Sequence, residues 1–132
     1  MPDLAPFTSP SGMVTLGEHY AGDVATGHVD RDDEGLELLT EKLDSGDPVI
    51  IDITTWLSDP HSGAHFVVVT GLSWDASNTN ATVRYNNPLT GRTEWADWAG
   101  HEGVWQAWQN NGDPGGSGWW LAIPSSAPAW LP

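Results

Sequence analysis

Polar side chains that could act together as a base and its orienting partner lie in the middle of the sequence. His65 begins the apolar run 66–69, and Asn86 and Asn87 lie just before Pro88. An imidazole can accept a proton near neutral pH, and an amide beside it can fix its tautomer and orientation. Antiparallel pairing of the strands that carry them would bring the histidine and one asparagine side by side. These residues offer two parts of a catalytic triad, and the nucleophile is missing.

The element that must position these side chains is a predicted β-hairpin over residues 65–88. The run Phe66-Val67-Val68-Val69 suits a strand buried on both faces, and residues 81–85 supply the returning strand. Between them, Ser77-Asn78-Thr79-Asn80 has the composition of a turn. We expect the chain to be organised around this hairpin.

An amphipathic helix is predicted upstream of the hairpin, over about residues 33–45. Acidic residues begin it, and Gly46 and Pro48 end it. Its apolar side chains recur at helical spacing, at Leu36, Leu39 and Leu43.

A buried strand is predicted next, over residues 48–53, and it contains one carboxylate, Asp52. A buried carboxylate is costly unless it is paired or hydrogen-bonded. We therefore expect Asp52 to contact Arg84 or Arg92, in preference to a catalytic role. Residues 54–64 then form a loop that leads to His65.

Three elements are predicted after the hairpin: a short strand over 93–95, a helix over 97–110 and a last strand over 119–123. The helix is weakened by two glycines in its first turns. Its tryptophans are spaced to share one face, at Trp98, Trp105 and Trp108. Together the elements predict an α+β fold, a twisted antiparallel sheet of about four to five strands with one or two packed helices.

The two ends of the chain lack this regular pattern. Residues 1–31 are interrupted by proline and glycine and are interpreted as an irregular connecting segment, with one short strand at 13–16. Residues 125–132 are a tail rich in proline, serine and alanine. One domain over residues 32–124 remains, and the length of 132 residues fits a single core.

Composition excludes several classes of function. Eighteen acidic residues face four basic ones, for a net charge of -14, which argues against nucleic acid and anionic membranes as partners. Most of this charge is interpreted as a solvated surface, with basic peptides or cations as the alternative partners. No apolar run is long enough to span a bilayer and the first residues do not form a signal peptide, so the localisation stays open. The chain has no cysteine and hence no thiol of its own.

Three segments together resemble a known family: Gly46-Asp47-Pro48-Val49-Ile50-Ile51, Ala64-His65-Phe66-Val67-Val68-Val69-Thr70-Gly71 and Tyr85-Asn86-Asn87-Pro88-Leu89-Thr90-Gly91. They are similar to the C-terminal half of peptidase C39-like domains, which are papain-like cysteine peptidases, and the likeness covers roughly residues 33–123. The resemblance implies a papain-like C-terminal lobe in which His65 is the general base and Asn87 orients it, as an asparagine does in papain. In the family, a cysteine nucleophile and an oxyanion-hole glutamine lie in an N-terminal helical lobe that this chain lacks.

Two interpretations follow from the resemblance. In the first, the chain is the His/Asn lobe of a cysteine peptidase and is inactive until a Cys-bearing lobe joins it. The expected substrate is a peptide or protein, and no cofactor is expected. In the second, it is a degenerate C39-like module that binds a peptide or a partner protein. Trp56 and Trp74 are the candidates for substrate-binding walls near the His65 strand.

Other sites are less favoured by the sequence. His61 and His65 have a zinc-like spacing, but Pro60 and the pair 62–63 indicate a loop, and no metal site is predicted. The acidic run 30–34 lacks the glycine and distal glutamate of a calcium loop. Most of the nine tryptophans are expected in the core, although a tryptophan-rich carbohydrate-binding domain with exposed coplanar rings stays a third alternative.

Overall fold

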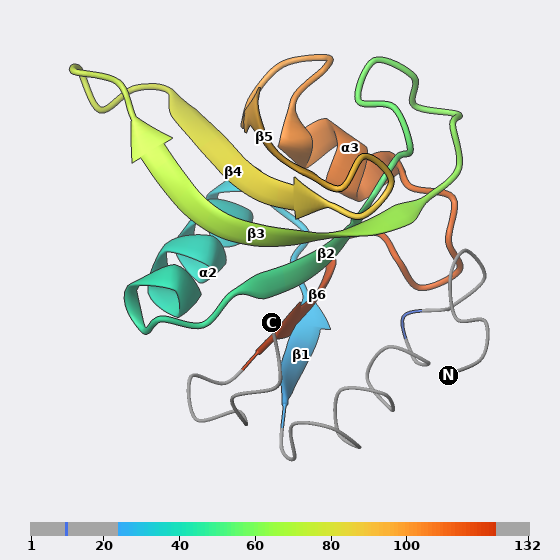
Figure 1. The fold of residues 1–132 in the computed structure, drawn as a ribbon, viewed down its shortest axis with the longest axis horizontal. Coiled ribbons are helices and arrows are strands. Elements are labelled where there is room, and N and C mark those ends of the chain that lie inside the picture. Colours follow the sequence, from blue (N-terminus) through green and yellow to red (C-terminus); the bar gives the residue numbers. More distant parts are fainter. Residues whose placement is uncertain (1–9, 11–23, 124–132) are drawn as a thin grey trace.

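The computed structural model describes residue 10 and residues 24–123, which form a sheet with helices on one side (Figure 1). The strands are β1 (Ala25–His28), β2 (Val49–Ile53), β3 (His65–Trp74), β4 (Ala81–Asn87), β5 (Arg92–Asp97) and β6 (Trp119–Ala122). The helices of this part of the chain are α2 (Asp32–Asp44) and α3 (Val104–Asn110). The expected strand over 13–16 and the tail over 125–132 lie outside the described residues.

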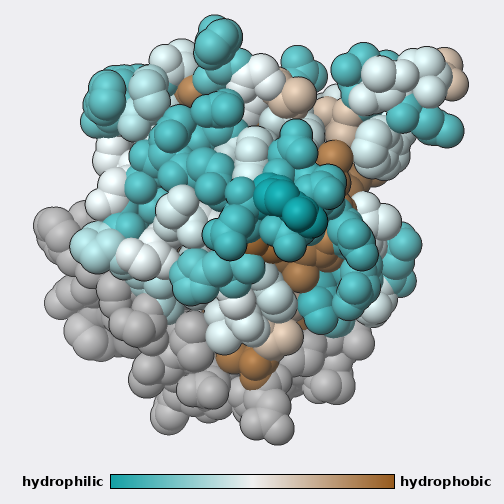
Figure 2. All heavy atoms as spheres, turned by 180° about the vertical axis from the view of Figure 1, so that it is seen from behind, coloured by the Kyte–Doolittle hydropathy of each residue, from teal (hydrophilic) through white to brown (hydrophobic). Residues whose placement is uncertain are grey.

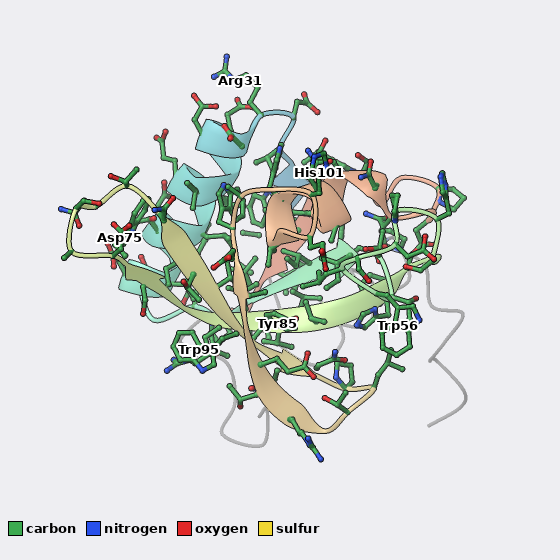
Figure 3. The ribbon with its side chains drawn as sticks, turned by 90° about the horizontal axis from the view of Figure 1, so that it is seen from above. Arg31, Trp56, Asp75, Tyr85, Trp95 and His101 are labelled. Atoms are coloured by element: carbon green, nitrogen blue, oxygen red, sulfur yellow. The ribbon has the colours of Figure 1, made fainter. Side chains whose placement is uncertain are left out.

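All neighbouring strands are antiparallel, in the order β1-β6-β2-β3-β4-β5. Both helices lie on the same face of this sheet, as the view from above shows (Figure 3). The α+β class is therefore confirmed, with six strands in place of the four to five expected. The strand that was not predicted is β1, whose four residues have no apolar alternation and which pairs with β6 from the other end of the chain.

The predicted amphipathic helix is confirmed to within one residue at each end as α2. Its first turn is acidic, which suits the partial positive charge of a helix N-terminus. Gly46 follows two residues after its last residue, with a φ of 82° that needs the freedom of glycine. Leu39 is fully buried and carries the apolar face of the helix into the core.

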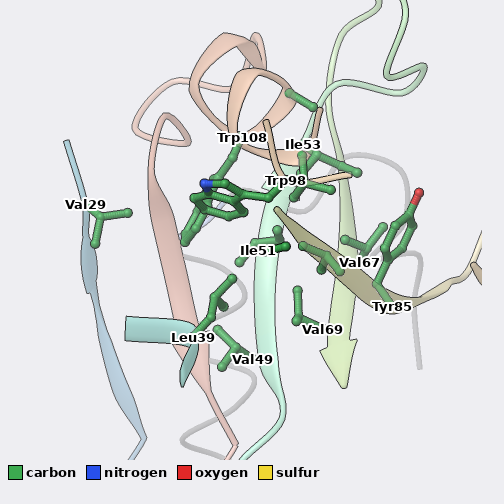
Figure 4. Close-up of a cluster of buried hydrophobic side chains, with 14 residues drawn as sticks. Val29, Leu39, Val49, Ile51, Ile53, Val67, Val69, Tyr85, Trp98 and Trp108 are labelled. Atoms are coloured by element: carbon green, nitrogen blue, oxygen red, sulfur yellow. The ribbon is translucent and has the colours of Figure 1, made fainter. Parts of the chain in front are cut away.

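The core lies between the two helices and the central strands (Figure 4). Pairing of β2 with β3 sets Val49 opposite Val69 and Ile51 opposite Val67, so four β-branched side chains share one face. These four and Trp108 of α3 are buried almost completely. The hairpin strands are thus held by packing as well as by their hydrogen bonds.

Three tryptophan rings close the core under α3. Trp98 lies 5.5 Å from Trp105 and 6.2 Å from Trp108, measured between ring centroids, and Trp105 lies 5.8 Å from Trp108. The helix predicted over 97–110 was wrong in its start, because α3 begins only at Val104, so Trp105 and Trp108 lie on it and Trp98 does not. Gly100, with a φ of 98°, turns the chain before the helix, so Trp98 reaches the cluster from the end of β5.

Of the other described tryptophans, Trp120 is half-buried and four divide between core and surface. Trp119 is buried and its ring lies 5.5 Å from that of Phe66, whereas Trp56, Trp74 and Trp95 are exposed. Figure 3 places Trp56 and Trp95 on opposite sides of the molecule, so these two rings form no common platform for a sugar.

Asp52 has a different partner from the one expected. Arg84 bonds instead to Thr70, with Nε donating to Oγ1 at 3.0 Å and Nη2 donating to the carbonyl oxygen at 2.9 Å. No ion pair within the described residues includes Asp52, which is fully buried. The Asp113 side chain lies beside it, in a loop that Asn111 ties to β2 by donating from Nδ2 to the Asp52 carbonyl oxygen at 2.9 Å. The expected contact with arginine was therefore wrong.

The burial of Asp52 favours the protonated form of its carboxyl group. Neither side-chain oxygen of Asp52 reaches hydrogen-bond geometry with a described group. Burial, and then the nearby Asp113 carboxyl group, raise the pKa of Asp52 to about 9. The folded protein therefore keeps Asp52 protonated at neutral pH.

Because Asp52 is protonated in the folded protein, we expect the free energy of unfolding to fall as the pH rises. The pKa of Asp52 is 3.8 without the folded surroundings and about 9 with them, so between these values the folded chain binds the proton more tightly than the unfolded chain does. Stability is lost through this window, at most about 1.4 kcal/mol for each pH unit. Urea unfolding of wild type and Asp52→Asn between pH 5 and pH 9 checks this. The asparagine variant should depend less on pH, and an equal slope for both would contradict the assignment.

The face seen from behind is mainly hydrophilic, with small hydrophobic areas between the polar side chains (Figure 2). Neither described helix has the length and apolarity needed to cross a bilayer.

Candidate active site

The hairpin brings His65 and Asn87 to the same face of the sheet. His65 is the first residue of β3 and pairs with Ile53 of β2. Asn86 pairs with Val68, and continuing this register sets Asn87 opposite Val67, two residues from His65. Because side chains alternate along a strand, His65 and Asn87 point to the helix-covered side as diagonal neighbours.

Asn87 is held on both sides of its amide. Its Oδ1 accepts a hydrogen bond from the Leu89 backbone N–H at 3.0 Å, and its Nδ2 donates to Glu94 Oε1 at 3.2 Å. Its carbonyl oxygen accepts from the Gly91 N–H at 2.8 Å, which closes the turn between β4 and β5. Only 8% of the residue is exposed, and these hydrogen bonds fix its position.

A carboxylate completes the polar cluster, and the sequence analysis did not identify it. Glu94 lies on β5 opposite Tyr85, and its Oε2 accepts a hydrogen bond from Thr90 Oγ1 at 2.8 Å. Hydrogen bonds from Thr90, Asn87 and Tyr85 lower the pKa of Glu94, so it is ionised at neutral pH. Burial, the charge of Glu94 and a hydrogen bond to it raise the pKa of Tyr85 to about 12. The only signal in the sequence was the position of Glu94 in the short strand predicted over 93–95, next to the hairpin.

His65 lies against these groups with its ring desolvated. Burial lowers the pKa of His65 below 6.5, while the neighbouring Asn87 amide and Glu94 carboxylate raise it by less. Both ring nitrogens are covered from solvent, and neither reaches hydrogen-bond geometry with a described residue. The imidazole is thus neutral at pH 7 and lies beside the Asn87 amide without a hydrogen bond to it.

The two tryptophans predicted as site walls lie in different places. Trp56 is 65% exposed and belongs to the loop between β2 and β3, three residues beyond Ile53, the strand partner of His65. Trp74 ends β3, nine residues from His65, and pairs with Ala81 at the hairpin tip. At about 3.3 Å for each residue, a full strand length separates it from the histidine. The structure brings Trp56 to the loop next to the site and leaves Trp74 at the opposite end.

Two surface hollows are formed by described residues near the sheet, and neither includes His65. One, of about 620 Å³, reaches Asn87 from the other face of the sheet, where Ile50, Val68 and Arg92 line it. The other, of about 590 Å³, lies beside Trp95 and His101. A ligand in either hollow would therefore not touch the His65 ring.

The described residues contain no group of three or more His, Asp or Glu side chains arranged to hold a metal ion. His61, the other histidine of the zinc-like spacing, is exposed in the loop before β3, where its N–H donates to Asp59 Oδ1 at 2.9 Å.

The fold is an α+β domain with a histidine and an asparagine on adjacent strands. Residues 6–113 match the Peptidase_C39 like family, and because this match covers most of the chain, the protein belongs to that family. The match begins at residue 6, whereas the resemblance in the sequence covers roughly residues 33–123. It ends at residue 113, before β6. No curated protein and no solved structure matches the chain.

Proposed function

We propose that the chain supplies the general base and its orienting residue to a C39-like cysteine peptidase site, with His65 as the base and Asn87 as the orienter. The sequence contains no cysteine, so the nucleophilic thiol comes from polypeptide outside these 132 residues. Alone, the chain does not cleave peptides. The observation that carries the proposal is the placement of a neutral His65 ring against the anchored Asn87 amide.

The chemistry follows from the state of these two residues. A neutral imidazole accepts the thiol proton, the thiolate attacks the peptide carbonyl, and the resulting imidazolium returns the proton to the leaving amine. The amide of Asn87 keeps the ring at a fixed angle through this cycle. Because both ring nitrogens are covered in the chain alone, the thiol-bearing polypeptide must displace what covers one of them.

The experiment joins the chain to a source of thiol. The chain is produced with the polypeptide that its gene encodes on either side, and cleavage of a fluorogenic peptide library is measured with and without iodoacetamide. The expected result is cleavage that needs a flanking cysteine and that iodoacetamide abolishes. The isolated chain should show no cleavage. Cleavage by the isolated chain, or cleavage that needs no cysteine, would contradict the proposal.

A second candidate is a C39-like module that binds a peptide or a partner protein without catalysis. It is favoured by the covered ring nitrogens of His65, which give the isolated chain no accessible base. Exposed Trp56 beside the site would then be a contact residue. The test is peptide binding to a protein with no flanking cysteine. If binding shifts the NMR signals of Trp56 and His65, this function is favoured over the first.

A further inference from the structure

A carboxylate lies directly behind the amide that is proposed to orient the base. Glu94 Oε1 accepts from Asn87 Nδ2 at 3.2 Å, while Oε2 accepts from Thr90 Oγ1 at 2.8 Å. Tyr85, opposite Glu94 across the strand pair, also hydrogen-bonds to it. Both carboxylate oxygens are therefore engaged, and Glu94 has a defined position although it lies near the surface.

These contacts allow only one orientation of the Asn87 amide. A carboxylate can only accept hydrogen bonds, and the Leu89 backbone N–H, which donates to Oδ1 at 3.0 Å, can only donate. Turning the amide by 180° would set oxygen against oxygen at Glu94 and N–H against N–H at Leu89. Without Glu94, one of the two contacts that fix the amide is lost.

The same carboxylate supplies a charge that the amide lacks. An asparagine can orient an imidazole, but as a neutral group it stabilises an imidazolium only weakly compared with a carboxylate. Glu94 is ionised and its charge acts on His65. In this arrangement Asn87 therefore orients the His65 ring, and Glu94 supplies the negative charge.

We propose that Glu94 is a positioning residue of this site: it holds the Asn87 amide in one orientation and, from behind that amide, stabilises the protonated form of His65. The inference rests on the proposed roles of His65 and Asn87. Glu94 lies on β5, outside the hairpin of β3 and β4 and outside the sequence segments that resemble the family.

The test measures the pKa of His65 by NMR in the full chain, with the ring signal assigned by its loss in His65→Gln. Glu94→Gln should lower that pKa by about half a unit, since the lost charge is partly screened by solvent. Glu94→Asp, which keeps the charge, should stay nearer to wild type. Asn87→Asp combined with Glu94→Gln moves the charge to the amide position and should return the pKa to the wild-type value or above it.

Glu37→Gln is the matched control, because it removes one exposed acid on α2 and changes the net charge equally. A His65 pKa that is the same in Glu94→Gln, Glu37→Gln and wild type would overturn the inference, as would a combined variant no higher than Glu94→Gln alone. These results do not depend on peptide cleavage. If cleavage proves independent of His65, the proposed function fails while the pKa series still decides whether Glu94 acts on the ring.

Discussion

Replacing His65 with alanine should lower kcat/KM for thiol-dependent peptide cleavage by about 100- to 10,000-fold, in the assay that joins the chain to its source of thiol. The loss is large because the variant has no group at this position to take the proton from the thiol or return it to the leaving amine. The ring is also the point where β3, Asn87 and Glu94 meet, so no neighbouring side chain replaces it.

A matched control for this prediction is His61→Ala. His61 lies four residues earlier in the exposed loop, and its backbone N–H, which the substitution keeps, makes its contact to Asp59. His61→Ala should cleave at the wild-type rate. Equal cleavage by His65→Ala and wild type, with both proteins folded by circular dichroism, would show that His65 is not the base.

Replacing Trp108 with alanine should lower the free energy of unfolding by about 3–5 kcal/mol. Trp108 is fully buried, lies in ring contact with Trp98 and Trp105, and donates from Nε1 to the Trp119 carbonyl oxygen at 2.7 Å. Alanine removes the ring, empties the space under α3 and leaves a buried carbonyl without its donor. A loss of this size is a large share of the stability of a domain of this length.

Urea denaturation followed by circular dichroism measures this effect. Trp108→Phe keeps a ring but not the indole N–H, so it should lose less than the alanine variant and stay folded enough to measure. Trp56→Ala is the control for the residue type, because Trp56 is 65% exposed, and it should change stability by less than about 0.5 kcal/mol. Similar losses for Trp108→Ala and Trp56→Ala would contradict the packing described for α3.

The strongest local patterns of the sequence predicted the central elements. Leucines at helical spacing between an acidic start and Gly46 gave α2, and the valine run after His65 gave β3 with its partner β4. Each of these signals is contained in a few neighbouring residues, and local hydrophobic spacing is enough to define them.

The features that the sequence did not reveal depend on distant partners. Strand β1 exists because it pairs with β6, and Asp52 meets Asp113 because a loop far along the chain folds over β2. Glu94 joins the site only through the register of β4 with β5. The start of α3 was misplaced because Gly100 turns the chain after β5, while the tryptophan spacing alone suggested a longer helix.

The most direct measurement is an NMR pH titration of His65 in the wild-type chain. This imidazole is desolvated beside Asn87 and is uncharged at neutral pH, so it can accept a proton. We expect a titration midpoint below 6.5, the ordinary value for histidine, and ring signals that change in Asn87→Ala. A midpoint at or above 6.5, with ring signals that the Asn87 substitution leaves unmoved, would contradict this expectation.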